Sequence, residues 1–140
     1  MPGATDPDDP TVKAVGKLTE AFETVERARG HLYAFHQLTG SADFCLEDAI
    51  GLLREAGYEE FSRRLDTELL GRNVLPGRWT FQVVEDYDDT YYEAFRAAAE
   101  EARKLTDGYR HRYEASLKEQ RRSRGVPGHE ATPDGLAPGV

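Results

Sequence analysis

The sequence is poor in cysteine and has no long hydrophobic run, and both absences exclude whole classes of protein. The single cysteine, Cys45, excludes an intramolecular disulfide and a zinc site built from several cysteines. No stretch reaches the roughly 18 apolar residues of a membrane-spanning helix. The first ten residues also lack the basic patch and apolar stretch of a signal peptide. We therefore expect a cytoplasmic protein without a membrane partner, in which Cys45 is a small buried hydrophobe.

Motifs that mark common catalytic and ligand sites are also missing. The chain has no Gly-x-Ser-x-Gly motif for a serine nucleophile and no glycine-rich phosphate loop. The Glu-x-x-His pair of di-iron bundles is absent, and the acidic clusters lack the spaced ligands and central glycine of a calcium loop. His31 and His36, five residues apart, diverge by about 140° on a helix. We assign no catalytic residue and expect neither a metal nor another cofactor.

The charge of the chain is unevenly distributed. The net charge is −8, with −7 on residues 12–108 and +4 on residues 109–125. The negative body disfavours nucleic-acid binding, because a phosphate backbone is bound chiefly through lysine and arginine, and the Arg-Arg-Ser-Arg segment at 121–124 offers few phosphate contacts. We expect residues 109–122 to form a basic helix that docks on an acidic surface of the same chain or of a second copy.

What the sequence has in abundance is helical periodicity. Apolar residues recur every three or four positions from residue 15 to Phe35, which predicts a first helix over about 11–39 with Thr11 as a possible N-cap. Gly40 stands where a helix-ending glycine would stand, and Ser41 could cap a second helix that ends before Gly57.

Two further helices follow, and one of them has a rival interpretation. The pattern predicts a third helix over about 58–70, ended by Gly71. Residues 79–85 alternate as a strand would, but the spacing from Phe81 to residue 105 is helical and much longer. A sustained period outweighs a short alternation, so we predict a fourth helix over about 79–106.

These predictions define an all-α fold. We expect an antiparallel helical bundle of four main helices plus the shorter C-terminal basic helix. One domain, residues 11–124, would lie between a disordered N-terminal tail at 1–10 and a disordered C-terminal tail at 125–140, both rich in proline with few apolar groups.

Asp88 occupies an apolar position of the fourth helix and is the most informative polar residue of the chain. Burying a lone carboxylate costs several kcal/mol, so Asp88 needs a partner, and Arg29 and His36 on the first helix are the first choices. Glu68 on the third helix and Tyr91 on the fourth complete a predicted buried polar network. The favoured interpretation is structural; the alternative is a small-molecule or metal site around His36, Glu68 and Asp88.

Two more groups of residues are candidates for binding. Arg72, Asn73 and Arg78 surround a Pro-Gly turn and could grip an anion, although offsetting the acids of the next helix is the favoured role for the arginines. A possible interaction surface combines acidic and basic segments that are rich in aromatic residues, namely Trp79, Tyr87, Tyr92, Tyr109 and Tyr113.

The sequence therefore favours a non-enzymatic protein. Its expected activity is protein–protein interaction or self-association. A small-molecule- or metal-binding bundle, which could be an enzyme, is the alternative. The first hypothesis requires exposed surface that a protein partner can cover, and the second requires convergent polar groups in a pocket.

Overall fold

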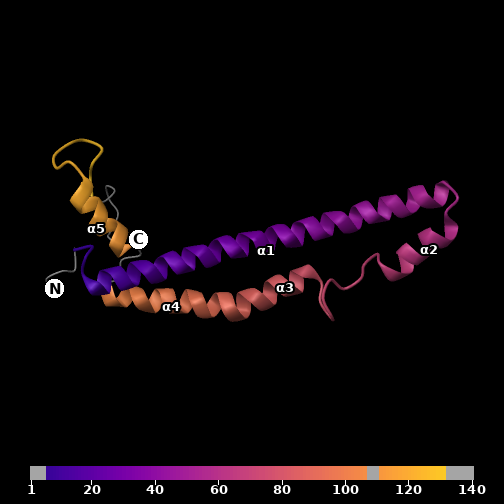
Figure 1. The fold of residues 1–140 in the computed structure, drawn as a ribbon, viewed down its shortest axis with the longest axis horizontal. Helices are drawn as coiled ribbons and strands as arrows, with labels where there is room; N and C mark the ends of the chain where they lie inside the picture. The colour runs from indigo at the N-terminus through magenta and orange to yellow at the C-terminus, as the bar shows by residue number, and fades with distance from the viewer. Residues whose placement is uncertain (1–5, 107–110, 132–140) are drawn as a thin grey trace. The chain divides into compact units, whose positions relative to one another are not determined.

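The computed structural model describes residues 6–106 and 111–131, which form helices and turns with no β-strand among them, so the predicted all-α fold class is confirmed. None of the described helices combines the length and the apolarity needed to cross a membrane. The elements, coloured along the chain in Figure 1, are α1 (Pro10–Glu55), α2 (Glu59–Glu68), α3 (Thr80–Tyr87), the π-helical turn η1 (Asp88–Tyr92), α4 (Glu93–Arg103), the 3-10 turn η2 (Lys104–Thr106) and α5 (Arg112–Arg121).

The chain forms two compact units, each described by itself. The central unit is Arg27–Tyr91, and the terminal unit contains the described residues up to Glu26 and from Tyr92 onward. Helix α1 contributes residues to both units.

Helix α1 begins at Pro10, one residue before the predicted start, and does not stop at Gly40. The carboxylate of Asp9 accepts hydrogen bonds from the backbone N–H groups of Thr11 (2.8 Å) and Val12 (3.3 Å), so Asp9 caps the helix rather than Thr11. Gly40 keeps a helical backbone, whereas a helix-ending glycine adopts a left-handed one. The first two predicted helices are therefore one, and Ser41 lies inside it.

The other two glycine stops are confirmed. Gly57 (φ 95°) and Gly71 (φ 72°) have left-handed backbones that favour glycine, and they follow α1 and α2. Asp43, in the interior of α1, accepts a hydrogen bond from the backbone N–H of Gly71 at 3.0 Å. This bond ties the end of α2 to the side of α1.

In the central unit, α3 packs antiparallel to α1. Arg29 contacts Asp88, just after α3, and His36 contacts Thr80 at its start. Residue numbers therefore increase along α1 while those of the contacted residues decrease, which is the antiparallel order. The buried side chains here include Ile50 of α1, and Val84 and Thr80 of α3. The helical prediction for residues 79–85 is confirmed from Thr80 onward. The side-chain oxygen of Gln82 accepts a hydrogen bond from the backbone N–H of Trp79, the residue before the helix, and this contact caps its start.

In the terminal unit, α4 packs antiparallel to the first part of α1. The ring of Phe22 stacks on Phe95 with centroids 6.2 Å apart and lies 5.7 Å from Tyr92. The buried apolar residues of this unit include Val12, Val15 and Ala102.

Helix α5 also packs on α1 in the terminal unit, at a glycine. A Cβ atom on Gly16 would lie 2.6 Å from Cβ of Tyr113, so the missing side chain of Gly16 makes the space for Tyr113. Helix α5 therefore docks on the same chain, and the side chain that it places against α1 at this point is Tyr113. Nδ1 of His111, the residue before α5, lies 3.6 Å from a carboxylate oxygen of Glu23, and Arg122 pairs with Glu119. Of the predicted anchors, Tyr109 lies outside the described residues.

The π-helical turn η1 changes which tyrosine faces α1. A π turn contains more residues than an α turn, so side chains after it rotate away from the positions of an uninterrupted helix. Tyr91, predicted in the buried stripe, is 56% exposed, and Leu105, predicted at its end, is 63% exposed. Tyr92, predicted as part of an interaction surface, is the tyrosine that packs on Phe22.

Candidate functional site

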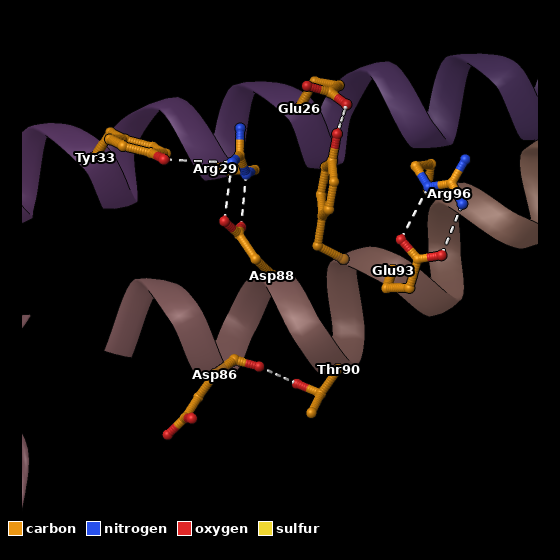
Figure 2. A network of polar contacts seen from close by, with 9 residues as sticks. Glu26, Arg29, Tyr33, Asp86, Asp88, Thr90, Glu93 and Arg96 are labelled. Carbon is orange, nitrogen blue, oxygen red and sulfur yellow. Dashed lines mark hydrogen bonds and ion pairs between the residues drawn. The ribbon is translucent and has the colours of Figure 1, made fainter. Parts of the chain in front are cut away.

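Asp88 forms a two-pronged ion pair with Arg29 in the central unit, as Figure 2 shows. Nε of Arg29 donates to one carboxylate oxygen at 2.6 Å, and Nη2 donates to the other at 2.9 Å. The guanidinium also lies 4.9 Å from the centre of the Tyr33 ring, on the next turn of α1. The predicted contact with Arg29 is present, but the two side chains are 27% and 26% exposed, so the pair is half-buried rather than largely buried.

The hydrogen bonds from Arg29 hold the pKa of the Asp88 carboxyl below its ordinary value of 3.8. A carboxyl with a lower pKa in the folded chain stabilises the fold above its unfolded pKa, and this stabilisation is lost as the pH falls through the lowered value. We expect the difference in free energy of unfolding between the protein and the Asp88→Asn variant to shrink between about pH 6 and about pH 2. Denaturant titrations of both proteins across this range measure it, and a constant difference would contradict the expectation.

The other members of the predicted network lie elsewhere. Nδ1 of His36 is 2.7 Å from the hydroxyl of the buried Thr80, not near Asp88. Glu68 is exposed on α2, and Tyr91 is exposed beside Tyr87, with ring centroids 5.8 Å apart. Among the described residues, no group of three or more His, Cys, Asp or Glu side chains is placed to hold a metal ion. The prediction that these residues form one cluster was therefore wrong. The helical period gives the direction in which a side chain points around its own helix. It does not give the position along the neighbouring helix that the side chain meets.

The predicted anion-binding turn is held by contacts within the central unit. The indole N–H of Trp79 donates to the carbonyl of Gly71 at 3.1 Å, which closes the loop between α2 and α3. Arg78 pairs with Asp86 on α3, in line with the favoured role of offsetting acids. Arg72 and Asn73 are exposed at the same loop and do not converge with Arg78 on a common partner.

The predicted aromatic interaction surface is divided between the units. Trp79 and Tyr87 belong to the central unit, where Trp79 is 43% exposed and Tyr87 is half-buried. Tyr92 and Tyr113 belong to the terminal unit and are half-buried against α1. The hydroxyl of Tyr92 donates to the carboxylate of Glu26. These two tyrosines serve packing inside their unit.

The terminal unit contains a surface groove of about 340 Å³ between α1 and α4. Rings of Phe22 and Tyr92 form part of its wall, and its charged lining residues are Glu23, Glu26, Arg96, Glu100, Arg103 and His111. Arg96 pairs with Glu100 at 3.0 Å and with Glu93, and its hydrogen bonds hold the pKa of the Glu93 carboxyl below its ordinary range. Both arginines of the groove, Arg96 and Arg103, are therefore paired with glutamates of α4.

Exposed apolar side chains are the most prominent surface feature of the central unit. Leu38 (68% exposed), Phe44 (73%) and Leu52 (66%) lie on α1. Phe35 is also exposed, and the prediction that Cys45 is buried was wrong, since Cys45 is exposed. Leu38 and Leu52 lie outside the predicted sites, although their separation of two heptads is a sequence signal for a second apolar face of α1.

Comparison of the chain with models of protein families, with curated proteins and with solved structures gives no match.

Proposed function

We propose that the chain is a non-enzymatic helical protein of the cytoplasm that acts by associating with proteins, itself included. The observation that carries this proposal is the apolar surface of the central unit, where Leu38, Phe44 and Leu52 are each about two-thirds exposed or more. Exposed apolar side chains favour an interaction site, because covering them with a partner removes apolar surface from water.

The contacts of charged residues also favour a protein partner over nucleic acid. Two of the three arginines in the Arg-Arg-Ser-Arg segment, Arg122 and Arg124, contact Glu119. Each basic group that contacts a carboxylate of the chain is less available to neutralise a phosphate.

A small-molecule or metal site around His36, Glu68 and Asp88 remains the second proposal and has less support. His36 bonds Thr80, Asp88 pairs with Arg29, and Glu68 is exposed. A ligand would have to displace Arg29 from Asp88 before it could use that carboxylate.

Association is measured by sedimentation equilibrium over about a hundredfold range of concentration. We expect a mass above the 15.7 kDa of one chain at the upper end. The mass should persist at about 1 M salt, where charges are screened beyond about 3 Å, because burial of apolar surface is the driving force.

A fluorescent dye that binds apolar surface separates the remaining outcomes. A monomer that binds the dye has apolar surface available for a different protein. A monomer that does not bind the dye at any concentration would overturn the proposed function.

A further inference from the structure

Helix α1 carries a second apolar stripe on the side that α3 does not cover. Starting at Ala28, alternate steps of three and four residues lead to Leu52 through Phe35 and Leu38, and none of the residues on these steps is Asp, Glu, Lys or Arg. In a chain with 31% charged residues, eight such positions in succession form a distinct pattern. The steps define about three and a half heptads, the repeat of helices that pack as a coiled coil.

The stripe is accessible in the central unit. Phe35 is 43% exposed, Leu38 is 68% exposed and Leu52 is 66% exposed. Arg29, His36 and Asp43, which contact α3 or the loop before it, lie on a different side of α1. In Figure 1, α2 and α3 both lie below this part of α1, which agrees with those contacts.

The order of side-chain sizes along the stripe fits a second copy running in the opposite direction. If position 35 of one copy faces position 45 of the other, then Phe35 meets Cys45 and Leu38 meets Ala42. The same register places Leu52 opposite Ala28. Each large side chain then faces a small one, which is the arrangement that fills space between helices without voids.

A parallel arrangement in register fits less well. Ala28, Ala42 and Ala49 would each face themselves, and facing alanines leave gaps between layers of facing Phe35 and Leu38. Charge agrees with the antiparallel choice. Arg27 and Glu55 flank opposite ends of the stripe, so an antiparallel partner brings each of them near a residue of opposite charge.

We propose that the stripe from Ala28 to Leu52 is a homodimer interface, in which α1 of one copy packs antiparallel to α1 of a second copy about a two-fold axis near Gly40. An interface of this kind is self-complementary, as a two-fold axis requires. The proposal rests on the proposed function, because it names the chain itself as the partner.

Disulfide cross-linking of the full chain tests both the interface and its direction. In the Phe35→Cys variant, Cys45 of one copy faces position 35 of the other, and mild oxidation should convert most chains to covalent dimers. Positions 35 and 45 are roughly 15 Å apart on one helix, too far for a disulfide within a chain. The matched control is Gln37→Cys, which keeps Cys45 and adds a thiol to α1 outside the stripe; it should form few dimers.

Two further outcomes decide the direction. The protein with its native Cys45 alone should give few covalent dimers, since an antiparallel register keeps the two Cys45 residues apart. Rapid cross-linking of Cys45 to itself, or of position 35 in the Phe35→Cys/Cys45→Ser variant, would overturn the antiparallel proposal in favour of a parallel dimer.

The strength of association tests the stripe without a new thiol. Leu38→Glu should weaken dimerisation by roughly 100-fold or more, because each dimer buries two Leu38 side chains. Gln37→Glu adds the same charge one position away and should change it by less than about threefold. Suppose that the chain associates, that Leu38→Glu and Gln37→Glu have the same dimerisation constant, and that Phe35→Cys gives no covalent dimer. The stripe is then excluded as the interface, while the proposed function stands. If the chain is a monomer that binds the apolar-surface dye, the second copy is excluded as the partner.

Discussion

Replacing Gly16 with alanine is expected to destabilise the terminal unit by about 1–3 kcal/mol, although the same change inside a helix ordinarily stabilises it. The new Cβ would lie 2.6 Å from Cβ and 2.9 Å from Cγ of Tyr113. Both atoms are close to the backbone of α5, so the clash cannot be relieved by rotating the end of a flexible side chain. Helix α5 would have to move away from α1, and Tyr113 would lose its packing.

The matched control is Gly30→Ala, elsewhere in α1. A Cβ on Gly30 meets nothing within 4 Å, so this variant should be more stable than the parent by about 0.5–1 kcal/mol. Urea unfolding of the three proteins, followed by circular dichroism, measures the two changes. Equal stabilisation by both alanines would show that Tyr113 does not rest on Gly16.

Asp88→Ala is expected to destabilise the central unit by about 1–3 kcal/mol. The change removes the two carboxylate oxygens that accept hydrogen bonds from Arg29 and leaves a half-buried guanidinium without its carboxylate. The figure is below that for a fully buried pair because about a quarter of each side chain reaches solvent.

Asp89→Ala provides the control for Asp88, because Asp89 is the exposed acidic neighbour in the same π-helical turn. It should change the free energy of unfolding by less than about 0.5 kcal/mol. Thermal melts of the two variants compare the positions directly. Equal melting temperatures for Asp88→Ala and Asp89→Ala would mean that the ion pair of Asp88 with Arg29 contributes nothing measurable to stability.

The parts of the fold that could be predicted are those set by local chemistry. Gly57 and Gly71 end helices because their left-handed backbones suit glycine, and that preference is visible in a sequence. The pairing of Asp88 with Arg29 was predictable because a carboxylate in an apolar stripe needs a cation.

The parts that could not be predicted depend on contacts between segments. Gly40 has the same local sequence signal as Gly57, yet its backbone stays helical and α1 continues to Glu55. The π-helical turn at Asp88–Tyr92 exchanges Tyr91 for Tyr92 at the packed face, and no residue type marks such a turn in advance. Glu68 was predicted in the buried network, but it is exposed on α2, because burial also depends on which helix lies opposite.

Helix α1 contains Gly30, Gly40 and Gly51 in its interior, roughly ten residues apart. Each glycine costs a helix about 0.5–1 kcal/mol relative to alanine, because the unfolded chain is freer at that residue. The length of α1 is therefore not a property of its own backbone preferences, and it depends on the side chains packed around it. The number of turns of α1 that remain helical therefore depends on how many of its faces are packed against other segments.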